Sequence, residues 1–348
     1  MAGLRSVSLL LAVPFAALLS ACGSSAQSGA GEGGPVHYVV VGQSGTLAGS
    51  NDGSAWSLRA PATDEDLHGV AAAKDGTVVA VGDAGTVLYS GDGAKTFQVA
   101  AAPTQSDLQA AAVDDQGHFV IGGNDDHTYY SDDGGKTWTA GKVIDPDGTV
   151  LITHLATDGS GRFLASGTVY HQATGGVGIR NRVYFSTDGG DSWSHVFDGD
   201  LQSIGGSLTS GLQGVATDGA HHYVTVGWKS QAFFASGDPT STWNASSGLP
   251  ADVKLDAVVR DDDNQRFIAG TLMGVLYSSS DNGQSFTKGC APLEGQSSVS
   301  DMVAGGGRVL AVGPGLGLVT SDGGGSCTTV PIAANDTNLI VFGVAYLP

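Results

Sequence analysis

The fold of this chain is decided by the stretch Ser131-Asp132-Asp133-Gly134-Gly135-Lys136-Thr137-Trp138, because variants of it recur along the sequence. Seven copies are present, and their central aspartates are Asp52, Asp92, Asp133, Asp188, Asp238, Asp281 and Asp322. Successive aspartates are separated by 40, 41, 55, 50, 43 and 41 residues. Self-similarity at such a period predicts an array of similar supersecondary units.

Each copy has the composition of a tight turn that leads into a strand. A carboxylate at a turn accepts hydrogen bonds from backbone N–H groups, and glycine permits the positive φ that such a turn needs. The aromatic residue that ends most copies is suited to fill the gap between neighbouring sheets. One aspartate per repeat, evenly spread, therefore predicts structural turns rather than metal ligands or catalytic acids.

The sequence around each copy predicts four short strands. In the second repeat, apolar runs at residues 67–72, 77–81, 86–90 and 96–99 are separated by turns rich in Gly and Asp. Such runs are typical of strands joined by hairpins. Four strands in a period of about 40–45 residues are characteristic of a propeller blade. The sequence thus predicts an all-β, seven-bladed β-propeller with four-stranded blades.

The two ends of the repeat array predict how the ring closes. The first repeat starts at what would be its second strand, residues 37–41. Residues 339–345 match the inner-strand pattern and have no second strand after them. We therefore expect the C-terminal strand to complete the first blade, which removes two free sheet edges.

The recurring pattern S-x-D-x-G-x-T-W resembles the Asp-box, or BNR repeat, of sialidase-like propellers. The first copy is one residue short, and the last has Cys327 in place of the aromatic residue. In size and blade number the chain also resembles the exported photosystem II assembly and stability factors and the bacterial propellers similar to them. The first resemblance implies the fold, and the second implies a protein that binds other proteins rather than a catalyst.

Composition agrees with this fold and excludes several classes of protein. Of the 34 acidic residues only three are Glu, namely Glu32, Glu65 and Glu294, and 55 of the 348 residues are Gly. Asp and Gly favour turns whereas Glu favours helices, so the composition argues against an all-α protein. A formal charge of −19 repels phosphate backbones, so nucleic acid is not an expected partner.

The N-terminal residues indicate export. An apolar stretch at residues 7–19 is short for a bilayer span and is followed by Ser20-Ala21-Cys22. Together with Leu19, this run resembles the lipobox of bacterial lipoproteins, which implies that Cys22 is acylated and begins the mature chain. The alternative is a plain secretory signal with an unrelated cysteine.

These features divide the chain into three parts. We expect a signal peptide at 1–21, a Gly/Ser-rich tether at 22–35 and the propeller at 36–348. The expected location is the cell envelope, periplasmic or at the cell surface, with the protein held to a membrane through lipid on Cys22.

Export would also place the two remaining cysteines, Cys290 and Cys327, in an oxidising compartment. They lie near the repeat turns of the sixth and seventh blades, which are neighbours. A disulfide between them is predicted, and two buried thiols are the alternative. The nine His residues show no metal-ligand spacing, and no metal or cofactor is expected.

A propeller with this strand order has two different faces. The repeat turns and the first-to-second-strand turns share one, which we call the turn face. The second-to-third-strand loops and the connections between blades share the other, the loop face, where long loops indicate function. We expect a ligand on the loop face, and the candidate residues are Trp228, Lys229, Tyr170, His171, Arg180, Arg182, His68 and Asp256.

Two sets of residues on this face allow more than one interpretation. Polar residues stand at matching points of the predicted inner strands: His68, Gln109, Thr153, Gln213, Asp256 and Ser300. They form either a polar ring at the channel mouth or solvated strand starts. Trp228, the one tryptophan outside the repeat turns, is either a contact for a partner or sugar or a cover for its own blade.

The resemblance to sialidases implies three arginines that bind a substrate carboxylate, a Tyr nucleophile paired with Glu, and an acidic Asp. In this chain only Arg59, Arg180 and Arg182 are expected to reach the loop face, so a sialidase is not predicted. Pairs of aspartates remain available to another glycosidase. The sequence predicts a monomeric, lipid-anchored propeller that acts as a non-catalytic protein- or glycan-binding scaffold; the alternative is a secreted glycoside hydrolase of sialidase-like fold.

Overall fold

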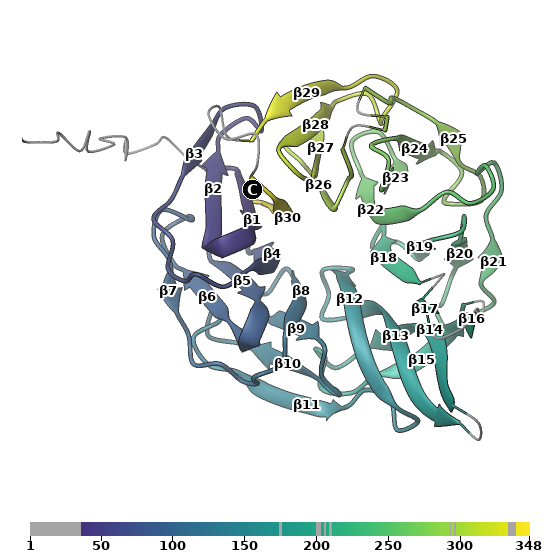
Figure 1. Cartoon of the computed structure of the whole chain (residues 1–348), viewed down its shortest axis with the longest axis horizontal. Coiled ribbons are helices and arrows are strands. Elements are labelled where there is room, and N and C mark those ends of the chain that lie inside the picture. The colour runs from purple at the N-terminus through teal and green to yellow at the C-terminus, as the bar shows by residue number, and fades with distance from the viewer. Residues whose placement is uncertain are drawn as a thin grey trace, which may run out of the picture. The chain divides into compact units, whose positions relative to one another are not determined.

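Seven four-stranded antiparallel sheets surround a central channel as the blades of a propeller (Figure 1). This computed structural model describes residues 36–173, 176–199, 203–204, 207–208, 211–292, 294–295, 297–332 and 339–348. The predicted signal peptide, Cys22 and the tether lie outside the described residues. The all-β, seven-bladed prediction is confirmed.

Strand labels follow the order of the chain, and the strands of each blade are named below from the channel outward. Blade 1 contains β30 (Val341–Tyr346), β1 (Tyr38–Gly42), β2 (Thr46–Ser50) and β3 (Trp56–Leu58). Blade 2 contains β4 (Leu67–Ala72), β5 (Val78–Gly82), β6 (Val87–Ser90) and β7 (Gln98–Val99). Blade 3 contains β8 (Leu108–Val113), β9 (Phe119–Gly123), β10 (His127–Ser131) and β11 (Thr139–Val143). Blade 4 contains β12 (Thr149–Thr157), β13 (Phe163–Ala173), β14 (Gly176–Ser186) and β15 (Ser194–Asp198).

The remaining blades follow the same order. Blade 5 contains β18 (Leu212–Thr217), β19 (His222–Gly227), β20 (Ala232–Ser236) and β21 (Asn244–Ala245). Blade 6 contains β22 (Leu255–Asp261), β23 (Arg266–Thr271), β24 (Leu276–Ser279) and β25 (Thr287–Lys288). Blade 7 contains β26 (Asp301–Gly305), β27 (Arg308–Val312), β28 (Leu316–Thr320) and β29 (Thr328–Pro331). A small hairpin, β16 (Ser203–Ile204) and β17 (Ser207–Leu208), precedes blade 5, and 3-10 turns η1 (Gln43–Gly45) and η2 (Asp83–Gly85) follow β1 and β5.

The hydrophobic core is divided among the gaps between blades. The described residues form seven buried clusters, and each cluster joins two adjacent blades. In β5, Val78 packs toward blade 1 and the next residue, Val79, packs toward blade 3. Successive side chains of a strand point to opposite faces, so a strand buried on both faces has a continuous apolar run instead of alternation.

The repeat turns join the third and fourth strands of each blade. In blade 3, Asp133 Oδ1 accepts hydrogen bonds from the backbone N–H groups of Lys136 at 3.1 Å and Thr137 at 2.9 Å. Thr137 Oγ1 donates to Asp133 Oδ2 at 2.6 Å, and this bond, together with the backbone N–H groups and the Ser131 hydroxyl, lowers the pKa of Asp133 to about 2. The carboxylate is therefore occupied within its own turn.

Glycine in the repeat turn also brings neighbouring blades together. Gly135 has φ +81°, which L side chains rarely adopt, and a Cβ at this position would lie only 2.4 Å from Val79 Cγ2 of blade 2. The turn of one blade thus rests directly on the second strand of the preceding blade.

The ring closes through the C-terminal strand. β30 pairs with β1 in antiparallel register, from Tyr38 opposite Tyr346 to Gly42 opposite Val341. Val341 and Val344 of this strand are buried in the cluster between blades 7 and 1. The predicted clasp is therefore confirmed.

A disulfide joins the outer parts of blades 6 and 7. Cys290 and Cys327 are bonded, with their Cα atoms 5.9 Å apart. The backbone N–H of Cys290 also donates to the carbonyl of Gly324 at 2.9 Å. The cysteines thus cross-link two neighbouring blades next to the closure.

Deleting residues 338–348 is expected to abolish cooperative unfolding, because the deletion exposes the edge of β1 and opens the cluster that contains Tyr38 and Val40. Calorimetry of the purified chain checks this. Removal of Pro348 alone, which is exposed, is the control and is expected to leave the transition unchanged. A wild-type transition in the longer deletion would disprove the clasp.

Candidate functional site

The central channel opens on the loop face, and its wall is built from the inner strands. The cavity measures about 650 Å³ and is lined by residues of all seven inner strands and their N-terminal approaches. A cavity of this size is in the range of ligand sites. The channel mouth is therefore the candidate functional site.

Six inner strands carry a β-bulge at the channel mouth. The register with the second strand skips one residue between Leu67 and Gly69, and equivalent skips occur in β8, β12, β18, β22 and β30. The bulged residues are His68, Gln109, Thr153, Gln213, Asp256 and Phe342, and all six line the cavity. A bulge inserts an unpaired residue and redirects its side chain.

Close packing explains why a small residue follows five of the six bulges. A Cβ on Gly69 would lie 2.9 Å from the carbonyl O of Gln109, and one on Gly343 would lie 2.5 Å from the carbonyl O of His68. Neighbouring inner strands thus nearly touch at this point. Gly or Ala occupies the equivalent position of β8, β18 and β22 as well.

The predicted polar ring lies at this level of the channel. His68, Gln109, Thr153, Gln213 and Asp256 are bulged residues, and Ser300 directly precedes β26; all six line the cavity. His68 Nε2 lies 2.6 Å from Asp83 Oδ1 in the loop of its own blade. The structure thus places these residues in the channel wall, the first of the two interpretations.

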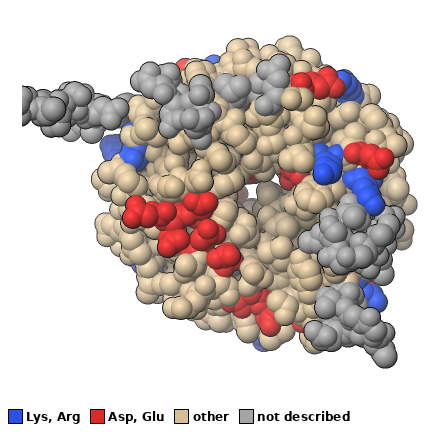
Figure 2. Space-filling view, in the orientation of Figure 1, with Lys and Arg blue, Asp and Glu red and all other residues tan. Residues whose placement is uncertain are grey.

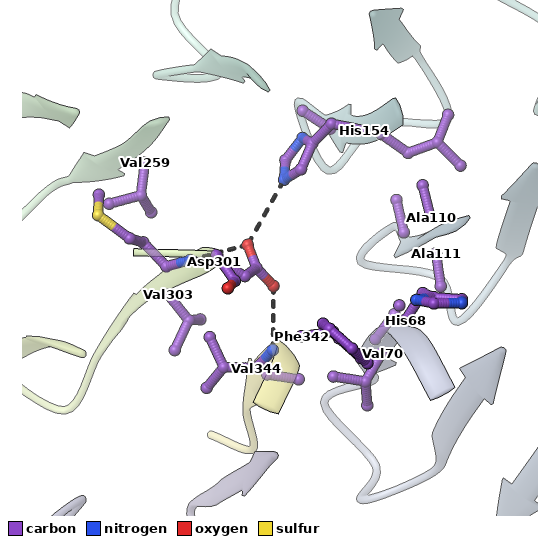
Figure 3. Close-up of a pocket in the computed structure, with 18 of the residues that line it drawn as sticks. His68, Val70, Ala110, Ala111, His154, Val259, Asp301, Val303, Phe342 and Val344 are labelled. Atoms are coloured by element: carbon purple, nitrogen blue, oxygen red, sulfur yellow. Dashed lines mark hydrogen bonds and ion pairs between the residues drawn. The ribbon is translucent and has the colours of Figure 1, made fainter. Parts of the chain in front are cut away.

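Two residues that sequence reasoning missed meet across the channel. His154 of β12 and Asp301 of β26 point toward each other, with Nε2 and Oδ1 3.8 Å apart (Figure 3). Asp301 Oδ2 accepts a hydrogen bond from Val344 N–H at 2.9 Å, and its Oδ1 accepts one from Met302 N–H at 2.7 Å. His154 Nδ1 is buried and has no hydrogen-bond partner among the described residues.

A signal for this pair exists in the sequence. In β12 the position after the bulge holds His154, where the equivalent strands have Gly or Ala. Asp301 follows Ser300 in the same alignment of the inner strands. A large polar residue at a position where the other inner strands have Gly or Ala is the signal that identifies both His154 and Asp301. Beyond this pair, further along the inner strands toward the turn face, the wall is mainly apolar, with Val70, Val259 and Val303 (Figure 3).

Trp228 and Asp256 meet at the rim of the channel, between blades 5 and 6. The Trp228 indole N–H donates to Asp256 Oδ1 at 2.7 Å, and Lys254 Nζ lies 4.9 Å from the centre of the indole ring. Burial raises the pKa of Asp256 to about 6, although the Trp228 hydrogen bond and the Lys254 charge oppose the shift. Lys229 follows in the same loop, half-buried and with φ +59°.

The other loop-face candidates belong to the long β13–β14 hairpin of blade 4. Tyr170 pairs with Thr149 of β12 and is half-buried, while the side chain of His171 lies outside the described residues. Arg180 is partly exposed, with Nη1 4.0 Å from Asp198 Oδ2. These residues belong to blade 4, whereas Trp228 belongs to blade 5.

Two of the arginine expectations are wrong. Arg182 is only 5% exposed, and it donates from Nε to Asp198 Oδ1 at 2.8 Å and from Nη1 to Asp145. It therefore stabilises blade 4 instead of facing a ligand. Arg59 Nε donates to the carbonyl of Ala94 in the repeat turn of blade 2 at 3.2 Å, so it points toward the turn face.

Charge is distributed unevenly on the loop face. Figure 2 shows the largest group of acidic residues on one side of the channel mouth, whereas on the opposite side basic residues lie next to smaller groups of acidic ones. The acidic group, which we call the acidic rim, belongs to the loops of blades 1 to 3 and consists of Asp64, Glu65, Asp66, Asp83, Asp107, Asp125 and Asp126. Part of it is structural, since Asp66 Oδ1 accepts from Ser44 N–H at 2.7 Å and Asp107 Oδ1 from Ala84 N–H at 3.0 Å.

Within the described part of the chain, no group of three or more His, Cys, Asp or Glu side chains is arranged to hold a metal ion. Over the same residues, no helix is long and apolar enough to cross a membrane.

Comparison with known proteins identifies the fold. No family model and no curated protein matches the chain. Among solved structures, YCF48 bound to D1 peptide has a TM-score of 0.55 and 17% identity over 86% of this chain and 85% of that one. Virginiamycin B lyase from Staphylococcus aureus has a TM-score of 0.55 and 11% identity, covering 78% and 85%. The GH74 xyloglucanase from Xanthomonas campestris has a TM-score of 0.55 and 15% identity, covering 90% and 55%.

Replacing Asp256 by Asn is expected to stabilise the protein above pH 6. Because the folded-state pKa is raised to about 6, the folded protein retains a proton that the unfolded chain loses between pH 4 and 6. Raising the pH through this window therefore lowers the stability of the wild type, by up to about 2–3 kcal/mol. The Asn variant escapes this loss and still accepts the Trp228 hydrogen bond.

Denaturant titrations of both proteins between pH 4 and 8 measure this effect. The difference in unfolding free energy is expected to grow with pH up to about 7 and to vanish near pH 4. A difference that does not change with pH would show that Asp256 titrates as it does in the unfolded chain.

Proposed function

We propose that this protein is a lipid-anchored, extracytoplasmic propeller that acts as a non-catalytic scaffold and binds a protein or glycan partner on its loop face. The observation that carries the proposal is Trp228. Its indole N–H is fixed by Asp256 at the channel mouth while the side chain stays partly exposed. Aromatic side chains held in one orientation are common anchors of binding interfaces.

The contacts of the three arginines expected on the loop face favour a binding function over a sialidase reaction. Three arginines able to hold a substrate carboxylate would have to converge on the channel. Arg182 is engaged with Asp145 and Asp198, and Arg59 is engaged with Ala94 of the next blade. Arg180 is partly exposed and has only a distant contact, with Nη1 4.0 Å from Asp198 Oδ2.

A protein partner is favoured by one similar structure. YCF48 was solved with a bound D1 peptide, so a propeller of this fold can hold a polypeptide. On this basis we infer a polypeptide partner, with glycan as the second ligand class. The lipobox-like run that ends at Cys22 supports the lipid anchor and the envelope location.

A glycoside hydrolase remains the alternative, because Asp256 and Asp301 both line the channel. Glycosidases use one carboxyl group with a raised pKa as general acid and a second as base or nucleophile. Asp256, with a pKa of about 6, suits the first role. Enzymes with a similar fold, such as the GH74 xyloglucanase, support this alternative.

Trp228→Ala is expected to weaken capture of an envelope partner about tenfold, because it removes the aromatic anchor. The measurement is affinity capture from native envelope by the full chain, with captured proteins and glycans identified. Melting temperature must be compared, since the variant also removes the hydrogen bond to Asp256. Trp228→Phe, which keeps an aromatic ring, is expected to retain part of the capture.

Turnover of a panel of aryl glycosides separates the two functions. The scaffold proposal expects none. Turnover that Asp256→Asn or Asp301→Asn abolishes, in a folded variant, would establish the glycosidase instead.

A further inference from the structure

We propose that the surface formed by Trp228, Lys254, Leu272 and Met273, which we call the blade 5–6 patch, docks a polypeptide segment with an apolar side chain next to a carboxylate. This inference rests on the proposed binding function and names the partner's chemistry. The patch lies on the loop face between blades 5 and 6, and Leu272 also lines the channel.

Exposed apolar side chains distinguish this patch from the rest of the loop face. Among the described residues, five large apolar side chains are exposed, and three of them belong to the outermost strands: Leu58, Val99 and Val143. The other two, Leu272 at 38% and Met273 at 55%, are neighbours in the β23–β24 loop. Exposed apolar groups beside a half-buried tryptophan indicate a contact surface.

The backbone under these side chains is held firmly. Leu272 N–H donates to the carbonyl of Lys254 at 3.0 Å, and Gly295 N–H donates to the carbonyl of Met273 at 2.9 Å. On the blade 5 side, Ser230 N–H donates to the carbonyl of Val253 at 2.7 Å. These bonds join four segments, namely the β19–β20 and β23–β24 loops and the connections that precede β22 and β26, into one surface before a partner arrives, which reduces the entropy lost on binding.

Lys254 provides the charge of the patch. Its side chain is exposed, and its ammonium lies 4.9 Å from the centre of the Trp228 ring. Among the described residues no carboxylate lies within ion-pair distance of this ammonium, although other surface lysines, such as Lys142 and Lys288, have such partners. A partner carboxylate would complete an interaction that the folded chain leaves open.

The acidic rim determines the orientation in which the segment binds. It occupies the opposite side of the channel mouth (Figure 2), where it repels a carboxylate. Repulsion by the acidic rim and attraction by the Lys254 ammonium both favour a partner carboxylate over blades 5 and 6. The segment therefore places its carboxylate at Lys254 and its apolar side chain at Leu272 and Met273, with a neutral or basic continuation toward blades 1 to 3.

Binding of short synthetic peptides to the full chain tests the inference. The probes are a peptide with Leu and Glu, the same peptide with Lys in place of Glu, and the same peptide with Ser in place of Leu. The first is expected to bind, and the other two to bind at least about fivefold more weakly. Raised salt is expected to weaken the first peptide, because part of the affinity is electrostatic.

Variants locate the binding. Met273→Ser and Lys254→Glu are each expected to weaken the first peptide about five- to tenfold. Matched controls are Val99→Ser, at an equally exposed apolar site on β7, and Lys136→Glu, in a repeat turn on the turn face. Both controls are expected to stay within about twofold of wild type.

Any outcome that differs from these expectations overturns the inference. Equal or stronger binding of the Lys peptide, binding of no peptide, or wild-type affinity in both patch variants would each disprove the docking chemistry. Envelope capture separates this failure from that of the proposed function. If a partner is captured equally well by the wild type and by Met273→Ser and Lys254→Glu, the scaffold function stands and only the docking patch is disproved. If the wild type captures no partner, both proposals are disproved.

Discussion

The structure depends on the close approach of neighbouring inner strands around the channel. At the position after each bulge the strands are so near that a Cβ on Gly69 would lie 2.9 Å from the carbonyl of Gln109. Gly343 of the C-terminal strand is under the same constraint against His68. Gly or Ala follows five of the six bulges, and the bulge just before each of them accommodates the tight curvature.

The same constraint shapes the site. A bulge turns one extra residue toward the channel, so the mouth is ringed by His68, Gln109, Thr153, Gln213, Asp256 and Phe342. Where the small residue is replaced, by His154, the larger side chain reaches across the bore to Asp301. The repeat turns are at the opposite end of the blades and use their aspartates internally. The repeat aspartates are thus engaged on the turn face, while Trp228, Lys254 and Met273 remain at least partly exposed on the loop face.

Much of this arrangement is predictable from sequence, because it repeats. Seven aspartate turns determine the number of blades, and the unmatched strands at the two ends predict the clasp. The polar ring is predictable because each of its members follows a buried aliphatic residue, as His68 follows Leu67. Contacts that occur in only one blade, and so are not part of the repeat, cannot be predicted in this way. Arg182 was expected on the loop face, but it is buried by Asp145 and Asp198, which lie 37 and 16 residues away in sequence and adopt their positions only in the folded blade.

Hydrogen exchange on the complex with the captured partner tests the central claim, that recognition belongs to the loop face, most directly. We expect slower exchange at residues 226–231, 252–256 and 271–275, where the loops of blades 5 and 6 present Trp228, Lys254 and Met273. Exchange at the repeat turns is expected to stay unchanged, since their N–H groups are already bonded to the aspartates. Protection confined to the repeat turns, with the loops of blades 5 and 6 unaffected, would contradict the account.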